Sequence, residues 1–170
     1  MMNIGLIAGT GQKEREIVMK TYATKYLELA RLHAEEIAKR WAQDVRSNTK
    51  TTFYKYLDEQ KIISQCIIFY QYFSQMFVDE KLNKDILKYF KTYARESYAM
   101  GIPMDEAIYA LILMRRHIWL YAEFQSIFST GIDQQQAVDT LSRTILLFDY
   151  AIYDITKEYQ ELMKKETNKK

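Results

Sequence analysis

The sequence predicts an all-α domain. Only 5 glycines and 1 proline occur in 170 residues, so residues that form tight turns are scarce. Apolar residues recur at intervals of three and four along most of the chain, as they do in helices with one buried face. No segment alternates apolar and polar residues as a half-buried strand would. We therefore expect long helices with short connections, and five principal helices can be placed.

The first predicted helix runs from about Gln12 to Arg46. Its buried stripe repeats every three or four residues and consists of Leu27, Ala30, Ala34, Ile37, Trp41 and Val45. Residues 1–12, MMNIGLIAGTGQ, precede it and hold an apolar patch followed by Gly-Thr-Gly. This is an incomplete nucleotide-binding fingerprint, and no second strand-like segment follows it. The segment is therefore interpreted as an N-terminal arm.

Two predicted helices occupy the middle of the chain. Asp58 is placed to cap the second helix, and Asn83 is placed to cap the third. Gly101 is expected to close the third helix in the left-handed conformation. The inner face of the second helix is predicted to carry Ile62, Cys66, Phe69, Tyr70, Phe73 and Phe77, and that of the third Ile86, Leu87, Phe90, Tyr93, Ala94, Ser97 and Tyr98.

The fourth predicted helix, residues 104–128, is apolar around nearly its whole circumference. Pro103 opens it, and Asp105 with Glu106 suits the positive end of the helix dipole. Such a helix belongs at the centre of a domain or in a subunit interface.

The last predicted helix follows a Ser-Thr-Gly break at 129–131. Asp133 and Gln136 fit a capping box, and the helix should end near Met163. Its inward residues are predicted to be Val138, Leu141, Ile145, Phe148, Ile152, Tyr159 and Leu162. The helices together indicate one domain over 13–165, with a disordered basic tail at 166–170.

Composition narrows the choice of partners and compartment. The net charge of +2 is too balanced for a nucleic-acid partner, because phosphate binding needs a concentrated basic face. Cys66 is the only cysteine, so no disulfide can form within the chain. The start of the chain is not that of a signal peptide, and no apolar run is long enough to span a membrane. A cytoplasmic location is expected.

Catalytic and metal-binding residues are not predicted. His33 and His117 are the only histidines, and neither completes a Glu-x-x-His pair of the di-iron type. A single cysteine excludes Cys-rich zinc sites, and Cys66 on an apolar helix face is interpreted as core filler. We therefore expect a protein that is not an enzyme and has no metal cofactor.

Three consecutive cationic or polar residues, Arg115, Arg116 and His117, interrupt the apolar fourth helix. Successive side chains point about 100° apart, so at most one arginine can face deep inside. Either the arginines pair with carboxylates at the surface or in a dimer seam, or one of them holds an anion such as a carboxylate, a halide or a phosphate. His117 is either a buried, hydrogen-bonded imidazole or part of a polar ligand pocket.

The segment RESYAMGIPMDEAIYALILMRRHIW, from Arg95 to Trp119, resembles the corner after the proximal helix of bacterial sensor globins. In those proteins a histidine a few residues before the glycine binds haem iron, but residues 95–100 include none. Together with the helix order and the part of the first helix around Trp41, this segment makes the chain similar to non-haem globin sensor domains. These include the N-terminal domains of stressosome proteins and the free-standing sporulation-inhibitory sensor-domain proteins of bacilli. The resemblance covers about residues 22–163.

The resemblance implies a globin-like helical sandwich without haem. It also implies a fatty acid or similar amphiphile as ligand, with a halide such as chloride nearby, and a homodimer of parallel helices formed by the last two helices. The chain would then act as a decoy for the sensor of a sporulation histidine kinase and inhibit sporulation. The pocket would be lined by Phe69, Phe73, Tyr98, Leu111 and Ile112, with Arg115, Arg116 and His117 near its mouth.

Two alternatives remain open at this stage. One is a haem-binding globin sensor ligated by His117 or His33, which would show a Soret absorption band. The other is a stressosome-type scaffold domain whose cavity is plugged by aromatic side chains and binds no ligand.

Overall fold

The computed structural model describes residues 24–79, 84–124 and 131–168, and all regular secondary structure within these ranges is helical. The prediction of an all-α chain is thus confirmed. A helical segment at 24–32 comes first. The elements that follow are α2 (Ala34–Ser47), the 3-10 helix η1 (Thr52–Tyr56), α3 (Glu59–Asp79), α4 (Lys84–Ala99), α5 (Met104–Phe124) and α6 (Gly131–Thr167).

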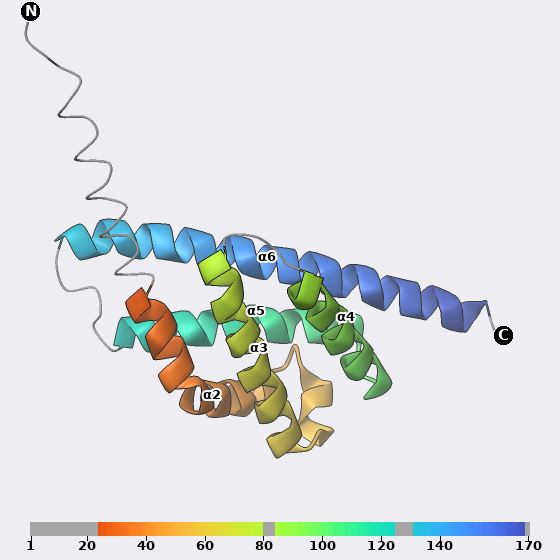
Figure 1. Cartoon of the computed structure of the whole chain (residues 1–170). Coiled ribbons are helices and arrows are strands. Elements are labelled where there is room, and N and C mark those ends of the chain that lie inside the picture. The colour runs from red at the N-terminus through yellow and green to blue at the C-terminus, as the bar shows by residue number, and fades with distance from the viewer. Residues whose placement is uncertain (1–23, 80–83, 125–130, 169–170) are drawn as a thin grey trace, which may run out of the picture.

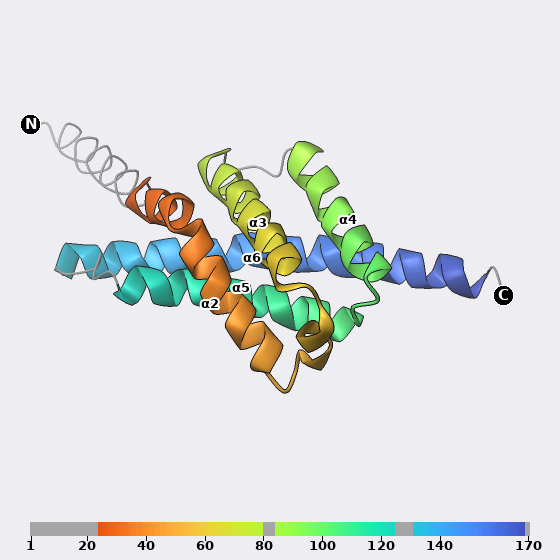
Figure 2. The ribbon, with the colours of Figure 1, turned by 90° about the horizontal axis from the view of Figure 1, so that it is seen from below.

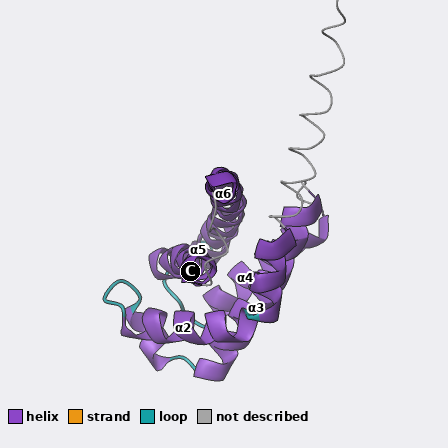
Figure 3. Ribbon diagram, turned by 90° about the vertical axis from the view of Figure 1, so that its left-hand side faces the viewer, coloured by secondary structure: helices purple, strands orange, loops and turns teal. Residues whose placement is uncertain are grey.

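The helices form two layers. α5 and α6 lie side by side as an antiparallel pair, and α2, α3 and α4 cross this pair on one side (Figures 1 and 2). Viewed along the pair, α6 lies at the edge of the molecule, and α2, α3 and α4 lie to one side of it (Figure 3). α6 contacts α3, α4 and α5, whereas α2 packs on α5.

The first predicted helix is wrong in one respect, because its described part is divided at His33. This residue has φ −110° and ψ 15°, outside the values of a regular helix, and the chain bends there (Figure 1). The His33 amide still donates to the Leu29 carbonyl at 3.0 Å, so the helical hydrogen bond is kept across the bend. The predicted stripe is confirmed on both sides of the bend: Ala30, Ala34, Ile37, Trp41 and Val45 are buried, and Leu27 is half-buried.

Two predicted helix ends are confirmed in atomic detail. The Asp58 carboxylate accepts a 2.7 Å hydrogen bond from the Lys61 amide, which makes it the N-cap of α3. Gly101 has φ +78°, and the amide of Ile102 donates back to the Ser97 carbonyl at 3.1 Å. Pro103 follows and its carbonyl receives the Ala107 amide, so it opens α5 as expected.

The core lies between α5 and the crossing layer. Trp41 is fully buried and its indole N–H donates to the Ala110 carbonyl of α5 at 3.0 Å. Tyr70 of α3 donates to the Met114 carbonyl of the same helix at 2.9 Å. α5 therefore receives hydrogen bonds from two crossing helices and packs on α6 as well, which confirms its central position.

The last helix differs most from its prediction. α6 begins at Gly131, two residues before the proposed cap at Asp133, and it continues to Thr167 instead of ending at Met163. The prediction that Val138 and Ile145 face inward is wrong, because their side chains are 60% and 38% exposed. The arm at 1–12, the cap at Asn83 and the predicted end of the fourth helix at 128 lie outside the described residues.

Candidate functional site

The predicted apolar lining of a ligand pocket is packed with aromatic rings. Phe69 and Phe73 of α3 are buried, and their ring centres lie 5.3 and 5.2 Å from that of Phe148 on α6. Phe69 also stacks on Phe90 of α4, with ring centres 6.2 Å apart. These distances are those of rings in direct contact. Around Phe69 and Phe73, aromatic side chains therefore occupy the space between α3, α4 and α6.

The other predicted lining residues lie in different surroundings. Leu111 is fully buried in α5, whereas Ile112 is half-buried. Tyr98 is half-buried at the C-terminal end of α4, where its hydroxyl donates to the Glu166 carboxylate and its ring packs on Tyr159. The bond to Glu166 raises the pKa of the Tyr98 hydroxyl. Tyr98 thus joins the C-terminal ends of α4 and α6.

The three polar residues of α5 lie in different surroundings. Arg115 is one-quarter exposed and forms a 3.2 Å ion pair with Asp149 of α6, which agrees with the surface-pairing alternative. Arg116 is exposed. His117 is 16% exposed, and its Nε2 lies 2.9 Å from a carboxylate oxygen of Asp44 on α2. His117 is therefore half-buried and hydrogen-bonded to α2.

A second polar group on the seam between α2 and α5 lies one turn beyond His117. Tyr121 donates to Glu36 at 2.7 Å, and Arg40 donates to the same carboxylate at 2.8 Å. These two contacts, Tyr121 first, lower the pKa of Glu36. The His33 ring packs on Tyr121 with centres 5.2 Å apart. Both histidines of the chain therefore lie on this seam, each beside a carboxylate of α2.

The seam residues Glu36, Asp44 and Tyr121 were missed by sequence reasoning. Asp44 directly precedes the buried Val45, which marks it as a residue at the edge of the stripe. Its partner His117 is 73 residues away in sequence, and a single sequence contains no signal for such a pairing. The seam links two helices and holds no nucleophile beside a base.

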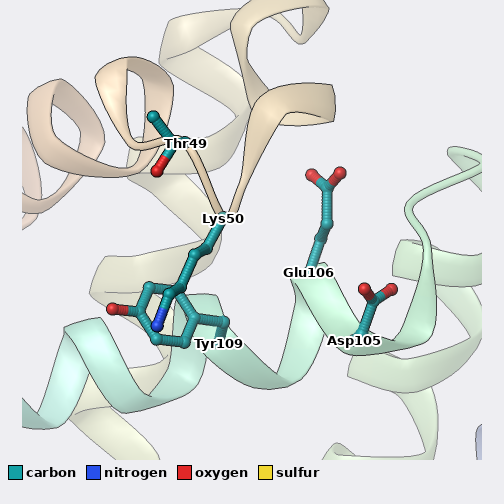
Figure 4. Close-up of a pocket in the computed structure, with 5 residues that line it drawn as sticks. All are labelled: Thr49, Lys50, Asp105, Glu106 and Tyr109. Carbon is teal, nitrogen blue, oxygen red and sulfur yellow. The ribbon is translucent and has the colours of Figure 1, made fainter.

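A small surface pocket of about 340 Å³, called the notch below, lies where the connection between α2 and η1 meets the first turns of α5 (Figure 4). It is lined by Thr49, Lys50, Asp105, Glu106 and Tyr109. Glu106 accepts hydrogen bonds from the Phe53 amide at 2.8 Å and from the Thr52 hydroxyl at 3.1 Å, so it anchors η1. The Lys50 ammonium lies 5.0 Å from the centre of the Tyr109 ring. These contacts give the notch a structural role.

Several of the large apolar side chains that are exposed lie on α6. Val138, Ile145, Leu146, Tyr150, Tyr153 and Met163 are 38% to 66% exposed, and we call them the α6 face. A groove of about 610 Å³ crosses this face, lined by Asp149, Ile152, Tyr153, Thr156, Lys157 and Gln160.

Cys66 is buried, and burial raises the pKa of its thiol, so it remains protonated as a core residue would. Among residues 24–79, 84–124 and 131–168, no group of three or more His, Cys, Asp or Glu is arranged to hold a metal ion. In the same ranges, no helix has the length and apolar content needed to cross a membrane.

Comparison with known proteins does not add an assignment. No protein-family model, curated protein or solved structure matches this chain.

Proposed function

We propose that this chain is a non-catalytic signalling domain of the globin-like sensor type, and that it acts by pairing with a second copy of itself through α6. The crossing of an α5–α6 pair by three further helices supports this architecture. The interior packing at Phe69 and Phe73 favours a domain that works mainly through its surface over one built around a large internal ligand.

The observation that carries the proposal is the reversal of polarity along the first half of α6. The buried side here includes Gln136, Thr140 and Thr144, while Val138 and Ile145 are exposed. A helix that served only its own core would place these residues the other way round. Exposed apolar side chains in this register indicate a surface that is covered in the functional state.

The α6 face has the dimensions of a helix-packing surface. From Val138 to Met163 it extends for about 37 Å at 1.5 Å per residue. Its six members fall within about 140° of the helix circumference at 3.6 residues per turn. Such a strip suits the side-by-side packing of a second helix, with Tyr153, which is 66% exposed, near the middle of the groove.

Charge placement favours a second copy as the occupant. Asp149 and Lys157 lie four residues on either side of Tyr153 and both line the groove. A two-fold axis at Tyr153 would set the two α6 helices antiparallel and bring Asp149 of each copy against Lys157 of the other. This differs from the parallel dimer that the resemblance implied. Pairing with the related sensor domain of a histidine kinase would give the decoy action expected from the same resemblance.

Sedimentation velocity of the full chain tests the proposal. The wild-type protein should be dimeric, and Tyr153→Glu should weaken the dimer at least about 10-fold by placing a charge in the centre of the seam. Tyr56→Glu is the matched control, because Tyr56 is 80% exposed on η1 and should leave the dimer unchanged. Lys157→Asp should also weaken the dimer by setting carboxylates of the two copies against each other, and it leaves the Arg115–Asp149 ion pair within the chain intact.

A wild-type protein that stays monomeric at about 100 μM would contradict the proposal, since useful dimers have dissociation constants well below this. Native mass spectrometry of the same sample identifies the other possible occupant. A monomer that carries the mass of a fatty acid would assign the groove to an amphiphile instead of a second copy.

A further inference from the structure

A stripe of cationic side chains runs along the outer side of α4. Its members, which we call the α4 stripe, are Lys84, Lys88, Lys91 and Arg95. All four side chains are exposed, and their spacing places them within about 60° of the helix circumference and over about 17 Å of its length. The buried residues of α4 fall on the opposite half of the helix. Since α4 also lies at one end of the crossing layer (Figure 2), the stripe faces away from the core.

The chain provides few counter-charges for this stripe. The Nε of Arg95 donates to the buried carboxylate of Glu158 at 2.8 Å, and the Arg95 side chain is still 60% exposed. Within residues 24–79, 84–124 and 131–168, none of the three lysines forms an ion pair. On α2, by contrast, Lys39 and Arg40 each pair with a glutamate one turn earlier. The α4 stripe therefore presents a positive charge to solvent.

The placement of these charges does not stabilise the helix. Like charges four residues apart repel each other on a helix surface, and Lys84 with Lys88 and Lys91 with Arg95 are two such pairs. Lys84 is also the first residue of α4, at the positive end of the helix dipole. Local rules are broken mainly at functional sites, so a stripe that opposes its own helix indicates a binding surface.

The surroundings of the stripe favour a narrow acidic partner. Asp85 and Glu96 are exposed and lie only about 60–80° beyond the edge of the stripe on the helix circumference. A broad anionic surface, such as a membrane or a nucleic-acid duplex, would bring its charges against these carboxylates as well. No large apolar side chain of α4, all of whose residues are described, is exposed and able to enter lipid. A helix with a single row of carboxylates would avoid both difficulties.

We propose that the α4 stripe binds an acidic helix of a partner protein, in which Asp or Glu recurs at the same spacing of four, three and four residues. Each carboxylate of that helix would face one cation of the stripe, and Asp85 and Glu96 would remain outside the contact. Because these charges are exposed, the contact forms rapidly, is weak and is screened by salt. The stripe lies on α4 and not on the α6 face, so the inference does not rest on the proposed dimer.

Two synthetic peptides test the match on the full chain. The first is a helical, alanine-rich peptide with four glutamates at i, i+4, i+7 and i+11. The second has the same composition and the same helicity by circular dichroism, but its glutamates are spread around the circumference. Fluorescence anisotropy at about 20 mM salt should show the first peptide binding at least about 5-fold tighter, and about 150 mM salt should weaken this binding. Equal affinity for the two peptides would overturn the proposal.

Charge reversal locates the binding site. Combining Lys88→Glu with Lys91→Glu should weaken binding of the first peptide at least about 10-fold, because carboxylates then face carboxylates. This variant should melt no lower than the wild type, since the new glutamates lie one turn from the remaining cations of the stripe. Combining Lys55→Glu with Lys61→Glu makes the same change in net charge at exposed positions of η1 and α3, and this control should bind like the wild type. Unchanged affinity in the first variant, or an equal loss in the control, would contradict a site on α4.

Other polyanions are compared in the same buffer. Single-stranded DNA of about 20 nucleotides and vesicles with about 30% anionic lipid should both bind more weakly than the first peptide. If either bound more tightly than the peptide, and lost this binding when Lys88 and Lys91 were reversed, the stripe would belong to a nucleic-acid or membrane site. That result would overturn the assignment of an acidic helix.

Discussion

Replacing Gly101 with alanine is the sharpest test of how the corner between α4 and α5 is built. Gly101 has φ +78°, where a residue with a Cβ is disfavoured by about 1–2 kcal/mol. Alanine also restricts the unfolded chain, which offsets about 0.4–1 kcal/mol of that cost. The added Cβ would lie 3.4 Å from the Phe53 ring, an ordinary contact, so steric crowding adds little. The net expected loss is about 1 kcal/mol of unfolding free energy.

For a chain of this size, a loss of that magnitude corresponds to a melting temperature lower by about 2–4 °C. Thermal unfolding followed by circular dichroism measures it, and urea titration gives the free energy independently. Gly101→Asn is the matched variant, because asparagine tolerates the left-handed region better than alanine, and it should lose about half as much. Two results would refute the claim that the left-handed conformation of Gly101 ends α4: a Gly101→Ala variant as stable as the wild type, or a Gly101→Asn variant no more stable than Gly101→Ala.

Three further predictions concern the core and the α2–α5 seam. Phe148→Ala should cost about 3–5 kcal/mol in urea unfolding, because Phe148 is fully buried between two rings of α3, and a loss below about 2 kcal/mol would contradict that packing. Tyr121→Phe removes the main cause of the lowered pKa of Glu36. A carboxylate whose pKa is lowered by folding stabilises the protein above its ordinary pKa of 4.5, and this stability is lost as the pH falls through the folded-state pKa. The variant should therefore lose less stability than the wild type between about pH 5 and pH 3. Parallel pH profiles of the two proteins would contradict this prediction. A double-mutant cycle of His117→Ala and Asp44→Ala should give a coupling of about 1 kcal/mol across their 2.9 Å contact, and additive losses would show that the contact contributes nothing.

Local features of the chain were predictable because their causes are local in sequence. The stripe on α2 follows from residue spacing, the cap at Asp58 from a short side chain three residues before the amide it accepts, and the end of α4 from a glycine. The bend at His33 has no such cause, since neither glycine nor proline is present there. Its ring packs on Tyr121, 88 residues later in the sequence, and long-range contacts of this kind leave no mark on the local pattern.

The site residues illustrate the same limit. The sequence correctly indicates that Phe69 and Phe73 face inward, but it cannot say whether they line a space or fill it. The answer depends on Phe148, which comes from a helix 75 or more residues further along the chain. On α6, the repeat places Phe148 and Tyr159 correctly on the inner side but assigns Val138 and Ile145 to the same side wrongly. It cannot decide which stripe faces the core, because the buried stripe carries threonines and the exposed one carries Val138 and Ile145.

The position of α6 connects its exposed face to the interior. Its inner side carries Phe148, against the rings of α3, and Tyr159, which donates to the Ile102 carbonyl at the α4–α5 corner. Its outer side carries Tyr153 in the groove. Any ligand that changed the packing of α3 and α4 would therefore have to move α6 or be resisted by it, since α6 contacts both helices. If the proposed dimer transmits a signal, a ligand must bind its paired and unpaired states with different affinities, because only such a difference shifts an equilibrium. Under the proposal, the dissociation constant of the α6 dimer, measured with and without a candidate ligand, is the quantity that would report sensing.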